Sequence, residues 1–203
     1  MSRPQIHTTR LDATANQALV DFARAGATAF GYTAELTLDR RLAQLLRLRV
    51  AQINNCTYCL DVHYRAARDI GVPQGKIDFL TAWWETLLFS DAERAALEYA
   101  EALTRVADTT AAQAFQQYHD RLAAHFDQAA MLEIVAVVVN MNVWTRLKLA
   151  EGAMPGVDRP PSSSAGSGAG RRQPDAQHGL ARAGLDADVP AVPVHDAPGD
   201  VQP

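Results

Sequence analysis

The chain has 203 residues and a formal net charge of −4, with 48% hydrophobic and 21% charged residues. This length and composition predict one packed domain with room for a tail. The acidic balance argues against nucleic acid as a main partner, because phosphate binding needs a basic face. The polar start at residues 1–11 contains no apolar signal-peptide core, so we expect a cytoplasmic protein.

Apolar residues recur at helical spacing through the first 150 residues, and no alternating strand pattern is present. On residues 38–53 they form one stripe, with Arg40, Arg41, Arg47 and Arg49 expected on the other faces. Capping-box patterns stand at residues 90–93 and 110–113, and Asp127 is the expected cap of the last helix. We therefore predict an all-α domain of about six to seven helices. Their approximate ranges are 12–30, 38–53, 56–70, 74–86, 90–106, 110–126 and 128–150.

The centre of the last predicted helix, residues 134–139, is apolar on every side and is expected to be buried all round. We predict no membrane span, because a span needs about 20 consecutive apolar residues. Glu133, Asn140 and Asn142 interrupt this stretch.

The composition changes after Gly152. Residues 153–203 contain eight of the ten prolines, seven of the twelve glycines and no aromatic side chain other than histidine. Such a segment buries too little apolar surface to offset the entropy of ordering it. We predict a helical domain over residues 1–152 and a disordered, low-complexity tail over 153–203.

Both cysteines of the chain, Cys56 and Cys59, lie three residues apart, and His63 follows four residues later. On a helix these three side chains share one face. With Asn55 as the N-cap, both thiols would lie in the first turn, where the helix dipole stabilises a thiolate. This arrangement suits peroxide reduction, in which one thiolate becomes a sulfenic acid and the second thiol condenses with it.

Three other interpretations of this motif remain open. A structural zinc site needs four ligands, and the motif offers three. A thioredoxin-like site needs a βαβ setting, and no strand is predicted. The pair could also be two small buried thiols beside a satisfied histidine.

Four stretches resemble one family in order along the chain: LRVAQINNCTYCLDVH at 48–63, LTAWWE at 80–85, FSDAERAAL at 89–97 and NVWTR at 142–146. They are similar to elements of the alkylhydroperoxidase D and carboxymuconolactone decarboxylase superfamily, over about residues 10–150. The resemblance implies an all-α fold that assembles as a trimer or hexamer. It also implies a thiol peroxidase without metal, haem or other cofactor, served by an external dithiol or thioredoxin-like reductant.

By the same resemblance, Cys59 is the peroxidatic thiol, Cys56 the proton donor and resolving thiol, and His63 part of a proton relay. The chain departs from the family pattern at Gln44, where a glutamate usually begins that relay. Glutamine can orient His63 but cannot accept a proton, so we expect a slower or differently tuned enzyme, unless Glu35 or Glu85 substitutes. The alternatives are a decarboxylase or lactone-processing enzyme of the same fold, and a redox-sensing module without catalysis.

Overall fold

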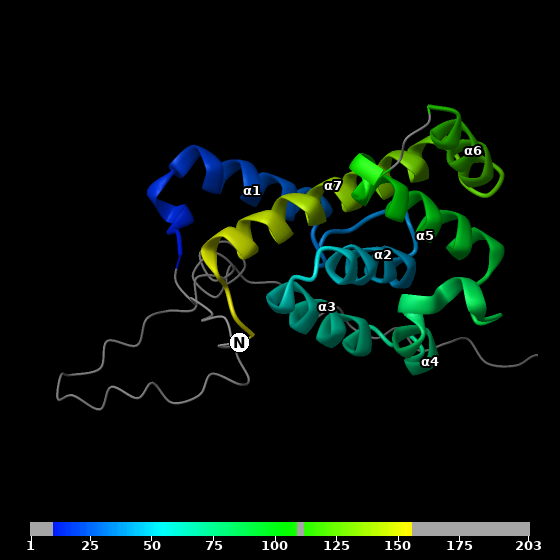
Figure 1. Cartoon of the computed structure of the whole chain (residues 1–203), viewed down its shortest axis with the longest axis horizontal. Helices are drawn as coiled ribbons and strands as arrows, with labels where there is room; N and C mark the ends of the chain where they lie inside the picture. The colour runs from blue at the N-terminus through cyan, green and yellow to red at the C-terminus, as the bar shows by residue number, and fades with distance from the viewer. Residues whose placement is uncertain (1–9, 109–111, 156–203) are drawn as a thin grey trace, which may run out of the picture. The chain divides into compact units, whose positions relative to one another are not determined.

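A computed structural model describes residues 10–108 and 112–155 of the protein. These residues form helices and no strand, which confirms the all-α prediction (Figure 1). The predicted tail lies outside the described residues, apart from its first three. The elements are η1 (Ala13–Ala15), α1 (Gln17–Phe30), α2 (Arg40–Ile53), α3 (Thr57–Asp69), α4 (Gln74–Asp78), η2 (Leu80–Glu85), α5 (Asp91–Thr104), η3 (Val106–Asp108), α6 (Ala112–Ala123) and α7 (Gln128–Glu151).

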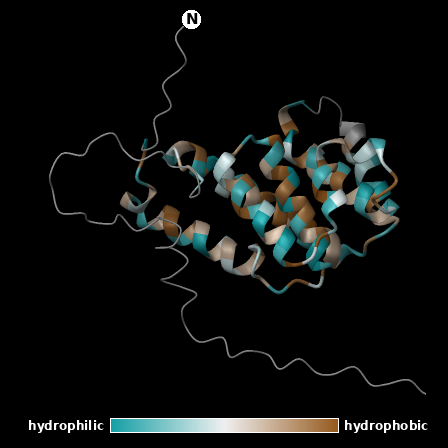
Figure 2. Cartoon of the chain, turned by 90° about the horizontal axis from the view of Figure 1, so that it is seen from below, coloured by the Kyte–Doolittle hydropathy of each residue, from teal (hydrophilic) through white to brown (hydrophobic). Residues whose placement is uncertain are grey.

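Helix α2 lies at the centre of the domain and packs against α3, α5 and α7 (Figure 1). Its apolar residues gather with those of the neighbouring helices in the interior (Figure 2). Leu45, Leu46 and Leu48 are completely buried. Each such leucine stabilises the fold by roughly 1.5–3 kcal/mol relative to an exposed one. The core therefore fixes the helix that directly precedes the two cysteines.

The expectation that all four arginines of α2 lie on outer faces is wrong for Arg47 and Arg49, which are 2% and 5% exposed. Arg49 Nε donates to Glu101 Oε1 of α5 at 2.6 Å, and Trp83 Nε1 donates to the same oxygen at 2.7 Å. A buried guanidinium is tolerated only with such partners. This network ties α2, η2 and α5 together.

The helix predicted over residues 74–86 is interrupted in the structure. It divides into α4 and η2, and Ala82 within η2 has non-helical torsion angles. Arg94 of α5 donates to the backbone carbonyls of Trp83, Trp84 and Thr86. The guanidinium thus satisfies carbonyl groups that a continuous helix would use internally. The capping box that opens α5 is confirmed, whereas the second predicted box includes residues outside the described part.

Helix α7 begins at the predicted Asp127 cap and ends at Gly152, whose φ of 71° is left-handed. Its length and composition would also fit a membrane span, a test that core helices of soluble proteins pass too. The prediction that its centre is buried all round is wrong, because Val139 is 54% exposed. Among the described residues, α1, α2 and α5, with smaller contacts from α3 and α6, pack on α7 and leave part of its surface uncovered.

Candidate functional site

The turn between α2 and α3 carries the motif and begins α3. Asn55 has a φ of +51°, a left-handed conformation that asparagine adopts more readily than most residues. The predicted N-cap at Asn55 is wrong by one residue, since Cys56 caps the helix and α3 starts at Thr57. The left-handed turn lets the chain reverse at Asn55, so that the next residue takes the extended conformation of a cap.

Cys56 and Cys59 are joined by a disulfide bond across the first turn of α3. Cys59 N donates to Cys56 Sγ at 3.3 Å, so the sulfur of Cys56 performs the capping. Only 1% of Cys56 and 4% of Cys59 is exposed. The two sulfurs are therefore within bonding reach of each other, beside the positive end of a helix dipole and largely shielded from water.

His63 follows Cys59 by one helical turn, on the same face of α3, and is buried. Burial, with a further contribution from the positive charge of Arg47, lowers the pKa of His63 from 6.5 to about 3. The imidazole is therefore neutral at physiological pH.

Gln44 reaches the site from α2, and only 1% of it is exposed. Its Nε2 lies 3.0 Å from His63 Nδ1 and 3.1 Å from the backbone oxygen of His63. The structure thus joins the four predicted residues in two pairs, Cys56 with Cys59 and Gln44 with His63, and Cys59 and His63 share one face of α3. Among the described residues, neither Glu35 nor Glu85 bonds to His63, and both are exposed.

Arg47, predicted to lie on an outer face of its helix, is a buried neighbour of the site. Its Nη2 donates to the carbonyls of Phe30 and Gly31 at the end of α1, at 2.9 and 2.8 Å. Its Nε is buried without a hydrogen-bond partner in the structure. Burial lowers the pKa of Arg47 to about 10, so the side chain stays cationic. Its position one turn after Gln44 on α2 was the available signal, because residues at this spacing share a face.

A second buried cation, Lys148 of α7, was also missed. It is 2% exposed, and its Nζ donates to Glu151 Oε2 at 2.6 Å. The ammonium lies 5.6 Å from the ring centre of Tyr58 and 5.5 Å from that of Trp144. Since Tyr58 stands between the two cysteines, this cation–π contact joins α7 to the first turn of α3.

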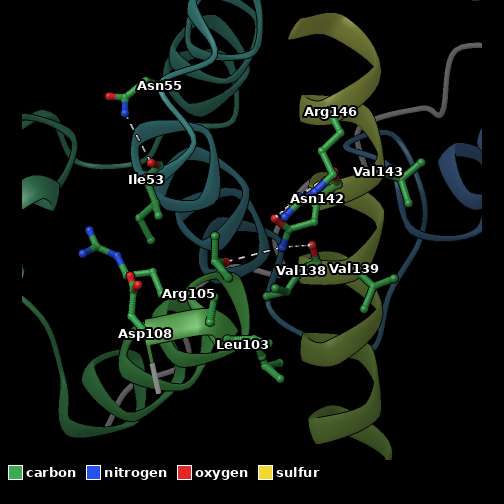
Figure 3. A pocket seen from close by; sticks show the side chains of 13 residues that line it. Ile53, Asn55, Leu103, Arg105, Asp108, Val138, Val139, Asn142, Val143 and Arg146 are labelled. Atoms are coloured by element: carbon green, nitrogen blue, oxygen red, sulfur yellow. Dashed lines mark hydrogen bonds between the residues drawn. The ribbon is translucent and has the colours of Figure 1, made fainter. Parts of the chain in front are cut away.

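An open cavity of about 860 Å³ lies beside the turn, between α7 and the end of α5 (Figure 3). Asn55 lines it, but neither cysteine does. Asn142 accepts from Asn54 Nδ2 at 3.1 Å and from Arg146 Nη1 at 2.7 Å. Asn142 therefore links the cavity wall on α7 to the residues before Cys56.

No group of three or more His, Cys, Asp or Glu side chains in the described part of the chain could hold a metal ion. Cys56 and Cys59 are bonded to each other, and His63 Nδ1 is engaged by Gln44. In this structure both sulfurs are thus used in the disulfide bond, and one ring nitrogen of His63 is used in the contact with Gln44.

Residues 20–102 match the carboxymuconolactone decarboxylase family. A protein of Bacillus subtilis, the uncharacterized YdfG, is 32% identical over 121 residues, which cover 60% of this chain and 80% of YdfG. The chain belongs to the carboxymuconolactone decarboxylase family. The uncharacterized YnjA of Escherichia coli is a second relative, 34% identical over 113 residues, which cover 56% of this chain and 60% of YnjA.

A solved structure from Agrobacterium tumefaciens shares the fold with a TM-score of 0.66 and 26% identity. The match covers 74% of the present chain and 99% of the Agrobacterium chain. That protein is of unknown function and is suggested to be the antioxidant defence protein AhpD. The expected membership of the alkylhydroperoxidase D and carboxymuconolactone decarboxylase superfamily is therefore confirmed.

Proposed function

We propose that the protein is a thiol-dependent peroxidase that reduces organic hydroperoxides or hydrogen peroxide. The observation that carries this proposal is the disulfide between Cys56 and Cys59 at the start of α3. It places two thiols where one can condense with an oxidised form of the other. The structural relative from Agrobacterium tumefaciens, whose suggested role is antioxidant defence, supports the same interpretation.

The reaction proceeds in three steps. The thiolate of Cys59 attacks the O–O bond of ROOH, the distal oxygen stays on sulfur, and RO⁻ leaves as ROH after taking a proton. The thiol of Cys56 then displaces water from the sulfenic acid of Cys59, which forms the disulfide. An external dithiol, or a thioredoxin-like protein, reduces this disulfide by thiol–disulfide exchange. The net change is ROOH plus one dithiol to ROH, water and one disulfide.

The proposal includes the location of the enzyme, which works in the cytoplasm without bound nucleic acid or a membrane.

The proposed enzyme forms a homo-oligomer, a trimer or hexamer, through apolar side chains that the described residues of one chain leave uncovered. Leu132 and Val139 of α7 are 60% and 54% exposed, and Phe22 of α1, which packs beside α7, is 62% exposed. Leu132 and Val139 are seven residues apart and so share one face of α7. Exposed apolar residues on one face are typical of an interface. A Val139→Lys variant should elute smaller than wild type on a sizing column with light scattering.

Thiol titration tests the peroxidase proposal, because the chain has two cysteines and no others. Reduced wild type, Cys56→Ser and Cys59→Ser each receive one equivalent of cumene hydroperoxide or of hydrogen peroxide. Two oxidants are used because only 4% of Cys59 is exposed, so access depends on the shape of the peroxide. Wild type should lose both thiols. Cys56→Ser should form a sulfenic acid that a dimedone probe captures, and Cys59→Ser should keep its thiol.

The same experiment separates the competing functions. Equal sulfenic acid in both variants would overturn the assignment of Cys59 as the peroxidatic thiol. Oxidation of wild type without repeated turnover, when a dithiol is supplied, would indicate a redox sensor instead of an enzyme. A decarboxylase or lactone-processing activity would be unaffected by Cys59→Ser.

A further inference from the structure

The side-chain amide of Gln44 makes two hydrogen bonds to one residue. Its Nε2 is 3.1 Å from the backbone oxygen of His63 and 3.0 Å from His63 Nδ1. A backbone carbonyl oxygen only accepts hydrogen bonds, so the amide atom that faces it has to be the NH₂ group. This contact fixes the orientation of the amide, which is otherwise ambiguous for glutamine.

The orientation of the amide determines the protonation of the ring. The NH₂ group has two hydrogens, and it donates one to the carbonyl and the other to His63 Nδ1. Nδ1 therefore accepts and carries no proton. In a neutral imidazole the proton then resides on Nε2.

We propose that Gln44 is a positioning residue that holds His63 as the neutral tautomer protonated on Nε2. This inference rests on the proposed peroxidase function for its catalytic consequence, but not for the tautomer itself. His63 then presents an N–H donor on the side away from Gln44. It stabilises a nearby thiolate or departing alkoxide by a hydrogen bond and does not serve as a base for a thiol proton.

A carboxylate at the same position would have the opposite effect. A carboxylate only accepts hydrogen bonds, so it would accept one from a protonated Nδ1. The other ring nitrogen, Nε2, would then carry no proton and act as an acceptor. Glutamine at position 44 donates to Nδ1, whereas glutamate would accept from it. The two residues therefore place the ring proton on opposite nitrogens. Compared with a site that has glutamate at this position, Gln44 changes which nitrogen of His63 is protonated and does more than remove a base.

The surroundings of His63 favour the neutral form as well. Arg47 of α2 is the charged group whose field reaches the ring, and it opposes a second positive charge. The ring of Tyr32, from the connection between α1 and α2, meets the imidazole edge-on with its centre 6.0 Å away. None of these three neighbours, Gln44, Arg47 and Tyr32, supplies a negative charge to the ring.

Nitrogen NMR of the imidazole rings tests the tautomer directly in the resting, oxidised protein. The chain has six histidines, and the signals of His63 are assigned by their loss in His63→Asn. In wild type at pH 7, Nδ1 should have the shift of an unprotonated nitrogen and Nε2 that of a protonated one. A protonated Nδ1 in wild type would overturn the proposal without the need for any variant.

Two variants extend the test to the consequence for the thiol. Gln44→Glu should move the proton to Nδ1. Gln52→Glu is the matched control, because Gln52 lies on the same helix and its Nε2 donates to Tyr64 OH of α3 at 3.1 Å. In a Cys56→Ser background, the apparent pKa of Cys59, measured by alkylation against pH, should rise with Gln44→Glu and stay nearly constant with Gln52→Glu.

Failure of this inference can be distinguished from failure of the proposed function. The expected tautomer without peroxide turnover would refute the peroxidase and leave the role of Gln44 intact. Peroxide turnover with a protonated Nδ1 would refute the positioning role and leave the peroxidase intact. If Gln44→Glu left the pKa of Cys59 unchanged, the claim that the tautomer of His63 affects the pKa of this thiol would be overturned.

Discussion

The buried His63 predicts a pH dependence of stability that can be calculated from the structure. Its pKa is about 3 in the folded protein and near 6.5 in the unfolded chain. Between these values the unfolded chain binds a proton and the folded protein does not. Lowering the pH therefore favours unfolding, and the stability present above pH 6.5 is lost as the pH falls toward 3.

The magnitude follows from the slope of about 1.4 kcal/mol per pH unit for one proton. From pH 7.5 to 5.0 the loss from this one ring is about 2 kcal/mol, because the unfolded histidine becomes protonated over that interval. The folded ring stays neutral at both pH values, so the unfolded chain determines the result. A change of this size is a large fraction of the stability of an ordinary domain.

Urea unfolding of the oxidised protein measures this effect. Wild type and His63→Gln are compared at pH 7.5 and 5.0, at one protein concentration, so that assembly contributes equally. All other titrating groups are common to the two proteins. Wild type should lose about 2 kcal/mol more than the variant on acidification. The same pH dependence in both proteins would refute the assignment of His63 as a buried neutral ring.

Other changes have expected outcomes of the same kind. Burial is the main cause of the lowered pKa of His63, and Arg47→Met removes the positive charge that lowers it further, so a pH titration by NMR should find that pKa raised, with Arg47→Lys closer to wild type. Glu101→Gln leaves a buried guanidinium without its counter-charge and should cost roughly 3 kcal/mol in urea unfolding. The exposed pair broken by Glu98→Gln should cost less than about 1 kcal/mol, and an equal loss would contradict this reasoning. Asn55→Val should cost about 1–2 kcal/mol, because valine adopts the left-handed conformation poorly, whereas Asn55→Gly should be neutral or stabilising.

Much of the helical structure could be predicted because its signals are local. Asp127 and the box at Ser90 cap their helices as expected, since a short polar side chain before an apolar run satisfies free amide groups. The break at Ala82 could not be foreseen, because it depends on Arg94, which is distant in sequence and takes the carbonyls of that segment. A residue that contributes from another helix leaves no trace in local periodicity.

The candidate site shows the same division between local and distant effects. The spacing of Cys56, Cys59 and His63 was sufficient to place them on one face of a helix. The contact of Gln44 with His63 was implied by the family resemblance and not by any pattern in the chain. The spacing of Arg47 from Gln44 indicated a shared face but not burial, and nothing indicated the burial of Lys148, because a charged residue is expected at the surface unless its partners are known. Those partners are backbone carbonyls, a nearby glutamate and two aromatic rings, and they become neighbours only when the helices pack.

The contact of Arg47 with the end of α1 makes the first helix part of the environment of His63. The guanidinium donates hydrogen bonds to the carbonyls of Phe30 and Gly31, and its positive charge acts on the imidazole of His63. If α1 detached or were removed by proteolysis, Arg47 would lose both partners and water would reach the imidazole. The protonation of His63 therefore depends on whether α1 is packed against the rest of the domain.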